Sequence, residues 1–326
     1  MPGKQRDPGR PAPWASGLVI VDKPGGMTSH DVVARIRRLA GTRRVGHAGT
    51  LDPMATGVLV IGIEKATRLL GHLMLTEKTY EATIRLGQST TTDDAEGELA
   101  GGRPASGVSR QALDEQVAKL TGDILQVPSS VSAIKVNGQR AYKLTRAGEA
   151  PELAARPVTV YEFAVLDVRQ DGDFLAVAVR VRCSSGTYIR ALARDLGAAL
   201  GTGGHLTALR RTAVGPYDIT QARTLEELED HNRDDPERGR LAPLARAVIP
   251  LAEAAAAAFP RLDLTADEAR RLAQGARLPL PAGVAAAAPV AAFGPDGTLV
   301  GLVTGEGGVL RSLAVFVDAA AGVSPR

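Results

Sequence analysis

Residues 46–57 restrict the fold of this chain more than any other segment. Their sequence, GHAGTLDPMATG, holds three glycines, one histidine and one carboxylate, and its only proline directly follows that carboxylate. Proline excludes the preceding residue from the α region, so we expect the backbone of Asp52 to be extended and its side chain to point in a fixed direction. The segment is too irregular for a helix or a strand, which predicts a loop. The apolar run that follows, residues 58–63, predicts a buried strand.

This pattern has two interpretations. A loop that carries an acid and an imidazole and is anchored to a rigid strand is typical of the way in which scaffolds present catalytic groups. Glycines and an Asp-Pro pair are also ordinary components of turns that have no chemical role. The spacing alone leaves both interpretations open.

The composition limits the size and the partners of the protein. With 326 residues, of which 44% are hydrophobic, the chain can bury a core, and its length predicts one large domain and one small one. The formal net charge is +3, and most of the 39 basic residues are arginines. Guanidinium groups bind phosphates in a bidentate manner, which suits RNA. The chain is also rich in Ala, Gly and Pro, so a general compositional bias explains the arginines equally well.

Cysteine and histidine usage argues against disulfide and metal chemistry. The single cysteine, Cys183, excludes an internal disulfide and a multi-cysteine zinc site, and its place on the apolar side of a predicted strand indicates a buried structural thiol. The five histidines lack metal-ligand spacing, so no metal site is expected. No apolar run is long enough to span a membrane and no signal peptide is visible, so we expect a soluble, cytoplasmic protein. The sequence leaves the oligomeric state open, and we expect a monomer.

Hydrophobic periodicity predicts an α+β fold. Apolar residues alternate with polar ones at 79–86 and 174–183, as in half-buried strands, and recur with helical spacing at 32–39 and 113–120. Strands follow one another through hairpins and irregular loops, which argues against a doubly wound sheet. We therefore predict a mixed, mostly antiparallel sheet flanked by helices. Further elements are expected at residues 18–21, 65–73, 123–136, 140–148, 158–169, 187–200 and 205–214, and a long loop at residues 87–108.

Several separated motifs change the interpretation of the central loop. In chain order they are LVIVDKP (18–24), GHAGTLDPMATG (46–57), KTYEA (78–82), TTDDAEG (91–97), QVP (126–128), SAIK (132–135), CSSGTYIR (183–190) and LRR (209–211). In this order and spacing the chain resembles the TruB family of tRNA pseudouridine synthases over roughly residues 17–225. The resemblance implies a pseudouridine synthase fold and the isomerisation of uridine 55 in the T-loop of tRNA to pseudouridine. No cofactor is implied, because the product is an isomer of the substrate.

The resemblance also implies a division of the chain. Residues 16–225 correspond to a catalytic domain, residues 226–250 to a linker region, and residues 251–326 to a small β-rich RNA-binding module that is PUA-like. The last assignment depends only on position and on the strand pattern. Residues 1–15 hold Pro, Gly and Arg with little apolar surface, so a disordered tail is expected there.

The resemblance implies roles for three charged residues, of which Asp52 and Arg190 are catalytic and Asp94 is substrate-binding. Asp52 matches the catalytic aspartate of the family, and a carboxylate suits a nucleophile that forms a bond and then leaves. Its point of attack, the ribose or the base, stays open. Arg190 matches the arginine that pairs with this acid and would keep it ionised and oriented. Asp94 matches a loop acid that can bind the same arginine, although the adjacent Asp93 leaves the loop register open.

Other matches concern the base that is flipped out of the RNA. Tyr80 and Tyr188 match aromatic residues that enclose this base. Stacking on such rings contributes about 1–3 kcal/mol per base and does not prevent the base from turning. Tyr80 is also expected to act in catalysis. Leu209 matches an apolar pocket residue, and His47 matches a residue that fills the space left by the extruded nucleotide. Core packing explains Tyr80 and Leu209 as well, and a backbone contact explains His47. Lys23 is expected at the site, either as a structural or as a substrate-binding residue.

A cluster of basic residues precedes the central loop, on one face of a predicted helix and in the loop after it. Such a cluster is usually a solvated helix face, but beside an active site it would bind RNA phosphates. We expect Arg43 and Arg44 to contact the substrate in this way. The cluster consists of Arg35, Arg37, Arg38, Arg43 and Arg44.

Two other functions stay open at this point. An RNA-binding or tRNA-folding protein would use the same fold without catalysis, and a guide-dependent pseudouridine synthase would act within a ribonucleoprotein. A Gly-rich phosphate-binding hydrolase is disfavoured, because the sequence lacks the Gly-Lys-Ser/Thr ending and a metal-carboxylate cluster.

Overall fold

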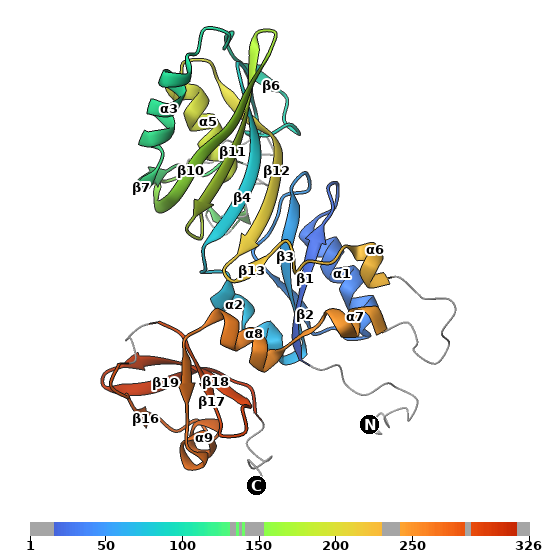
Figure 1. Ribbon diagram of the computed structural model, residues 1–326, viewed down its shortest axis with the longest axis vertical. Helices are drawn as coiled ribbons and strands as arrows, with labels where there is room; N and C mark the ends of the chain where they lie inside the picture. Colours follow the sequence, from blue (N-terminus) through green and yellow to red (C-terminus); the bar gives the residue numbers. More distant parts are fainter. Residues whose placement is uncertain are drawn as a thin grey trace.

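Residues 16–130, 135–136, 139–140, 153–229, 242–283 and 288–317 are described by the structure, a computed structural model. The tail predicted at residues 1–15 and residues 141–148 of the predicted basic helix lie outside the described residues. Figure 1 shows a long sheet with its helices in the upper part of the molecule and a smaller sheet below it. The predicted α+β fold with a C-terminal β-rich module is confirmed.

Within the described residues, ten strands form the main sheet. Neighbouring strands are antiparallel throughout, except for β3 and β12, which are parallel. The predicted mixed, mostly antiparallel sheet is therefore confirmed. In spatial order the strands are β14 (Ile249–Pro250), β1 (Gly17–Lys23), β3 (Thr56–Ile63), β12 (Gly204–Val214), β4 (Lys78–Leu86), β11 (Phe174–Cys183), β10 (Arg156–Asp171) and β7 (Gly122–Gln126), while β2 (Val45–Ala48) pairs with β3 and β13 (Tyr217–Asp218) with β12.

The parallel contact between β3 and β12 joins the two halves of this sheet. Thr56 lies opposite Arg210, and Gly57 lies opposite Arg211. The backbones approach so closely at Gly57 that a Cβ atom there would lie 2.2 Å from the carbonyl oxygen of Arg211, and the φ angle of Gly57 is 98°. Only glycine tolerates both conditions, so Gly57 permits the observed distance between the strands.

The central segment contains more strand than we predicted. β2 includes residues 46–48, and β3 begins at Thr56, so only residues 49–55 are irregular. The prediction of a loop over all of residues 46–57 is wrong at both ends. Hydrogen bonds to neighbouring strands override the weak strand propensity of the glycines, because sheet propensity depends strongly on tertiary context.

The half of the sheet that contains β1 and β3 is covered on both faces. Val19 and Val21 pack against one group of helices, and Leu18 and Ile20 pack on the opposite face. A strand buried on both faces has no polar side, which explains the continuous apolar run in β3. The first face carries α1 (Ser29–Ala40), α6 (Leu225–Glu229) and α7 (Ala242–Ala247), and the second carries the 3-10 helix η1 (Glu64–Arg68), α2 (Leu70–Leu73) and α8 (Leu251–Ala258) (Figure 1).

The other half of the sheet packs against α3 (Arg110–Lys119) and α5 (Ile189–Ala199). In β4, Tyr80 and Ile84 belong to the core shared with these helices, whereas Glu81 is exposed. The alternation predicted for residues 79–86 is therefore confirmed. Two short sheets pair β5 (Ser89–Thr90) with β6 (Leu99–Gly101) and β8 (Lys135–Val136) with β9 (Gln139–Arg140).

The C-terminal module is built on a second sheet of five strands within the described residues. Helix α9 (Ala266–Ala273) packs against it and begins with a capping box. The backbone N–H of Glu268 donates to Oγ1 of Thr265 at 3.3 Å, and the N–H of Thr265 donates to Oε2 of Glu268 at 2.8 Å. In spatial order the strands are β15 (Arg261–Asp263), β17 (Val290–Phe293), β18 (Leu299–Glu306), β19 (Val309–Val315) and β16 (Leu278–Pro279).

A shared apolar cluster attaches the module to the main sheet. Phe293 and Phe316 of the module belong to the same buried cluster as Leu69, and Nζ of Lys65 donates to the carbonyl oxygen of Phe316 at 2.9 Å. Part of the predicted linker, strand β14, pairs with β1. The domain boundaries stay a prediction. None of the helices in the described part of the chain is long and apolar enough to cross a membrane.

Gly57→Ala is expected to lower the free energy of unfolding by at least about 2 kcal/mol, because it combines an unfavourable backbone conformation with a collision against β12. Urea unfolding measures this loss. Gly26→Ala is the matched control, since Gly26 also has a positive φ of 77° but nothing lies within 4 Å of its Cβ position. We expect this control to lose about 1 kcal/mol. Equal losses in the two variants would contradict the importance of the strand contact.

Candidate active site

Asp52 lies in the loop between β2 and β3, next to the parallel strand pair. Its carbonyl oxygen accepts a hydrogen bond from the backbone N–H of Ala55 at 3.1 Å, which closes a tight turn at Pro53. The side chain of Asp52 is 36% exposed, so solvent and substrate can reach the carboxylate. The loop therefore presents an acid at an accessible position on a rigid support.

The residue before Asp52 is fixed to helix α1. Oγ of Ser29 donates to the carbonyl oxygen of Leu51 at 3.2 Å and accepts a hydrogen bond from the N–H of Leu51 at 2.9 Å. The side chain of Leu51 is buried in the same core as Tyr80. These contacts restrict the backbone on the N-terminal side of Asp52.

The residue after Asp52 is held by a buried lysine. Nζ of Lys23, at the end of β1, donates to the carbonyl oxygen of Pro53 at 3.2 Å and to those of Met27 at 2.7 Å and Pro24 at 2.8 Å. Burial lowers the pKa of Lys23 to about 8, and the charge of Asp52 opposes this shift. Lys23 thus lies at the site, where its ammonium group donates hydrogen bonds to backbone carbonyls around the loop.

Arg190 connects two carboxylates. This residue is in the first turn of α5 and is 4% exposed. Its Nε lies 3.0 Å from Oδ2 of Asp52, and its Nη1 lies 3.3 Å from Oδ2 of Asp94. Nη1 also donates to the carbonyl oxygen of Thr92 at 2.8 Å. A planar guanidinium with several fixed donors is suited to hold all three acceptors in one geometry.

The sequence left open whether Asp93 or Asp94 faces Arg190, and the contacts of two arginines of α5 decide this. Asp94 faces Arg190, whereas Oδ2 of Asp93 lies 3.3 Å from Nη1 of Arg194, one helical turn further on. Asp93 has a positive φ of 60°. The backbone N–H of Glu96 donates to Oδ1 of Asp94 at 3.0 Å, which orients the Asp94 carboxylate within the loop.

A buried glutamine fixes the start of α5. Oε1 of Gln126 accepts a hydrogen bond from the N–H of Tyr188 at 2.8 Å, and its Nε2 donates to the carbonyl oxygen of Tyr188 at 3.1 Å. Gln126 is 2% exposed, whereas Tyr188 is half-buried. The side-chain amide therefore holds the backbone two residues before Arg190, and with it the direction of the first turn.

An apolar wall adjoins the ion pair. Tyr80 and Leu209, each 8% exposed, lie on the neighbouring strands β4 and β12 and share one buried cluster with Leu51 and Ile189. Leu51 directly precedes Asp52, and Ile189 directly precedes Arg190. The cluster therefore connects the wall with both charged groups. Burial raises the pKa of Tyr80, and the nearby charge of Arg211 opposes this shift.

His47 is in β2, close to a second histidine. The ring of His30 approaches that of His47 edge-on, with centroids 5.6 Å apart. Nδ1 of His47 is buried and has no hydrogen-bond partner within the described residues. Burial lowers the pKa of His47, with a further contribution from the charge of His30. The ring is therefore predominantly neutral at neutral pH.

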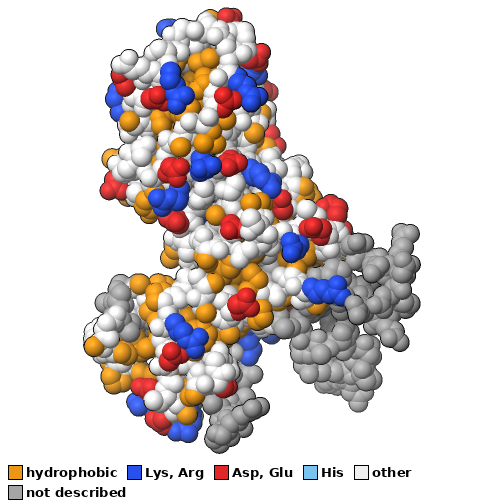
Figure 2. All heavy atoms as spheres, viewed as in Figure 1, with side chains coloured by type: hydrophobic (Ala, Val, Ile, Leu, Met, Phe, Trp, Pro, Cys, Tyr) orange, Lys and Arg blue, Asp and Glu red, His pale blue; other side chains and the backbone are white. Residues whose placement is uncertain are grey.

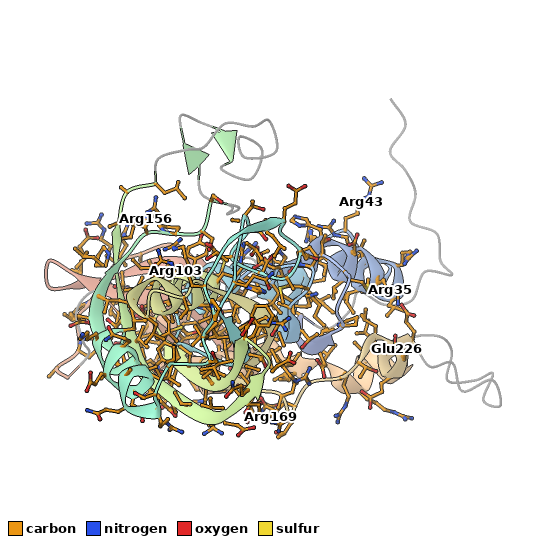
Figure 3. All side chains as sticks on the ribbon, turned by 90° about the horizontal axis from the view of Figure 1, so that it is seen from above. Arg35, Arg43, Arg103, Arg156, Arg169 and Glu226 are labelled. Atoms are coloured by element: carbon orange, nitrogen blue, oxygen red, sulfur yellow. The ribbon has the colours of Figure 1, made fainter. Side chains whose placement is uncertain are left out.

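The predicted phosphate-binding arginines lie at the surface, between α1 and β2. Arg43 and Arg44 are both exposed, and Nη1 of Arg44 lies 3.5 Å from Oε2 of Glu64. Figure 3 shows Arg43 and Arg156 on one side of the molecule and Arg169 on the opposite side. On the face seen in Figure 2, basic and acidic side chains are interspersed. The contact of Arg43 and Arg44 with substrate stays a prediction.

Three polar residues at this site were missed from the sequence alone. Gln126, Arg194 and Arg211 all have side chains that hold the backbone or an acid near the ion pair. The sequence contains one signal for Arg211, since it follows Leu209 by two positions and therefore shares the buried face of a strand. A charged residue on an apolar face indicates a specific buried role.

Cys183 is buried and free, as predicted. Burial raises its pKa to about 11, which leaves the thiol protonated and unreactive at neutral pH. The described residues hold no group of three or more His, Cys, Asp and Glu side chains that is placed to bind a metal ion.

The ionisation of Asp52 results from two opposing effects. Burial raises its pKa above the ordinary value, while the charge and the hydrogen bond of Arg190 lower it. A partly desolvated carboxylate that is held in position requires little reorganisation before it attacks a carbon atom. The site can therefore form and break a covalent bond at Asp52 next to an apolar wall that accepts a flat ring.

Fold and site together define a pseudouridine synthase. The chain is similar to one chain in the crystal structure of a Cbf5–Nop10–Gar1 complex, with a TM-score of 0.72 and 29% identity over 93% of this chain and 85% of that chain. It is also similar to a chain in the structure of an H/ACA RNP bound to a substrate RNA containing 2′-deoxyuridine, with a TM-score of 0.70 and 26% identity over 97% of this chain and 92% of that chain.

The chain belongs to the TruB family of pseudouridylate synthases. The model of the TruB family N-terminal domain matches residues 37–189, and two C-terminal domain models of tRNA pseudouridine synthases match residues 190–256 and 259–317. The tRNA pseudouridine synthase B of Streptomyces coelicolor is 60% identical over 92% of this chain and 97% of its own length. That of Thermobifida fusca is 60% identical over 93% and 99%.

The buried Lys23 makes stability depend on pH in a defined window. In the folded protein it releases its proton near pH 8, whereas the ordinary pKa of the unfolded chain is 10.5. Between these values the unfolded state binds more protons, so the contribution of Lys23 to the free energy of unfolding rises with pH. Lys23→Met removes this contribution, and we expect its stability to fall relative to the wild type as the pH rises from about 7.5 to about 10.

Urea unfolding at several pH values measures this difference. Lys119→Met on α3 is the control, because it removes an exposed lysine instead of a buried one. A pH-independent difference for Lys23→Met would show that Lys23 keeps its ordinary pKa in the folded protein.

Proposed function

We propose that this protein converts uridine 55 in the T-loop of tRNA to pseudouridine, with Asp52 as the nucleophile. The observation that carries the proposal is the ion pair of 3.0 Å between Asp52 and the buried Arg190, beside the wall formed by Tyr80 and Leu209. The names of relatives that are 60% identical support tRNA as the substrate.

Substrate binding precedes the chemistry. Arg43 and Arg44 bind tRNA phosphates, and the target uridine leaves its stack, at a cost of a few kcal/mol, to reach Asp52. His47 occupies the space that the nucleotide leaves, for which a neutral, partly buried imidazole is suited. Tyr80, Tyr188 and Leu209 enclose the base, and ring stacking lets it turn while it stays bound.

The reaction exchanges one bond to the base for another. The bond between C1′ of the ribose and N1 of uracil breaks, the base turns, and C5 forms a bond to C1′. C5 loses a proton and N1 gains one, so the product has the same atoms as the substrate and no co-reactant is needed. Asp52 forms a transient covalent bond with the ribose or with the base and is released at the end.

Arg190 controls the reactivity of Asp52. Its charge keeps the carboxylate ionised against the effect of burial, and its Nε orients one oxygen. Asp94 binds the same guanidinium and keeps it in place when Asp52 forms its covalent bond. The surrounding apolar cluster excludes water, which would otherwise hydrolyse a detached sugar intermediate. We further propose that the enzyme acts as a monomer in the cytoplasm.

Asp52→Asn tests the proposed nucleophile. The amide keeps the size of the side chain and one acceptor for Arg190 but cannot form the covalent intermediate, so we expect turnover to fall by at least about 10³-fold. Binding of unmodified tRNA should change by less than about twofold, because the carboxylate contributes mainly to the chemical step. The measurement is pseudouridine formed in a tRNA transcript by the purified chain alone.

The control is Asp171→Asn, which alters an exposed aspartate that also pairs with an arginine, Arg85, at 2.9 Å. It should retain full turnover. Appreciable turnover by Asp52→Asn would remove Asp52 from the mechanism. A wild-type chain that binds tRNA but forms no pseudouridine would favour a guide-dependent synthase or a binding protein without catalysis. The structural similarity to chains of H/ACA complexes is the reason to test the guide-dependent alternative.

Arg43→Ala with Arg44→Ala tests the proposed phosphate contacts. Each lost phosphate contact should reduce the slope of log Kd against log salt by about 0.7–0.9, so the double variant should lose about 1.5 in all. Filter binding of tRNA at several salt concentrations measures this slope. Arg169→Ala is the control, because Arg169 lies on the opposite side of the molecule (Figure 3). An unchanged slope in the double variant would remove both arginines from the interface.

A further inference from the structure

Arg211 is a buried cation at the contact between the two halves of the main sheet. It is 1% exposed and lies opposite Gly57 of β3 and opposite Tyr80 of β4. Its Nε donates to the carbonyl oxygen of Val58 at 2.7 Å, and its Nη2 donates to the carbonyl oxygen of Gly49 at 3.0 Å. One guanidinium therefore contacts Gly49, where the irregular segment that carries Asp52 begins, and Val58 in β3, three residues after this segment ends.

The charge of Arg211 lacks a carboxylate partner within the described residues. The adjacent Arg210 differs, since its Nη2 lies 2.6 Å from Oδ2 of Asp22, and Arg190 differs because it contacts two acids. A buried charge without a counter-ion is costly and lowers stability unless its hydrogen bonds are well satisfied. The two backbone carbonyls accept hydrogen bonds from two of its N–H groups. A buried charge that is held in this way indicates a role that an uncharged residue would not fill.

The positive field of Arg211 acts on groups at the site. It opposes the rise in the pKa of Tyr80. It contributes to the lowered pKa values of Lys23 and His47. The same side chain thus contacts the Asp52 loop at Gly49 and lies on β12 opposite Tyr80, a residue of the apolar wall.

We propose that Arg211 is a positioning residue for the reaction, which fixes the distance between the Asp52 loop and the Tyr80 ring. This inference rests on the proposed function and deepens it. The separation of nucleophile and wall determines whether a turning base stays in reach of the carboxylate, and a misplacement of about 1 Å costs up to about 10²-fold in rate. A lysine cannot replace the arginine, because it carries a point charge and cannot span both carbonyls with fixed donors.

Arg211→Lys tests this role, because it keeps the charge and loses the planar donor arrangement. We expect kcat for tRNA to fall about 10–100-fold while KM and the affinity for tRNA change by less than about twofold. Arg210→Lys is the matched control, since it alters the neighbouring residue on the same strand, and its kcat should stay within about twofold of the wild type. A loss of kcat in both variants would assign the effect to the strand contact in general and overturn the proposal.

The titration of His47 reports whether the charged group of Arg211 lies close to the site. Arg211→Met removes the charge, so the pKa of His47 should rise, whereas Arg211→Lys should leave it close to the wild-type value. NMR of the full chain, assigned with His47→Gln, measures both. An unchanged His47 pKa in a folded Arg211→Met protein overturns the proposal. If that variant does not fold, Arg211→Lys decides: a kcat within twofold of the wild type, or a loss confined to KM, overturns it.

These experiments can refute the role of Arg211 and the proposed function independently of each other. A wild-type chain that forms no pseudouridine in tRNA would refute the function itself, and the His47 titration would still report whether Arg211 acts on this site. A wild-type chain that is active, with an Arg211→Lys variant that is equally active, would refute the role of Arg211 alone.

Discussion

The close parallel approach of β3 and β12 is the constraint on which the rest of the structure depends. It joins the two halves of the main sheet at Gly57, where a side chain would collide with the backbone of β12. The loop that carries Asp52 therefore ends directly beside the strand that carries Leu209 and Arg211. Because β12 also pairs with β4, the same contact brings Tyr80 into the site. A sheet joined in this way presents the Asp52 loop on a support whose β1 and β3 strands are buried on both faces.

Two buried arginines have different tasks around this contact. Arg190 faces the carboxylates of Asp52 and Asp94 directly, so its charge is compensated and acts on the reacting group. Arg211 holds backbone carbonyls that belong to residues 162 and 153 positions away along the chain, and its charge is not compensated by a carboxylate within the described residues. In the proposed mechanism, the first arginine sets the ionisation of Asp52, and the second sets its position. Lys23 adds a third buried cation, which binds the loop through Pro53.

The C-terminal module is part of the same mechanical unit. Its phenylalanines pack in one cluster with β1 and α2, and Lys65 binds the end of its last strand. A module that is held by a buried apolar cluster keeps a fixed distance from the Asp52 loop, because apolar cores are packed too densely to slide. The RNA binding predicted for this module would benefit from such a fixed spacing, since fewer degrees of freedom are lost on binding.

The sequence by itself determined the features that depend on neighbouring residues and on short motifs. The proline after Asp52, the alternation in β4 and the ordered motifs together indicated the fold class, the family and the principal acid, arginine and tyrosine. Only the tertiary structure decided that Asp94 and not Asp93 faces Arg190, that Lys23 binds the loop backbone, and that Gln126 and Arg211 support the site. These contacts join segments that are far apart in the chain. Local propensity carries no information on such pairings, because they form only when strands distant in sequence are brought together in one sheet.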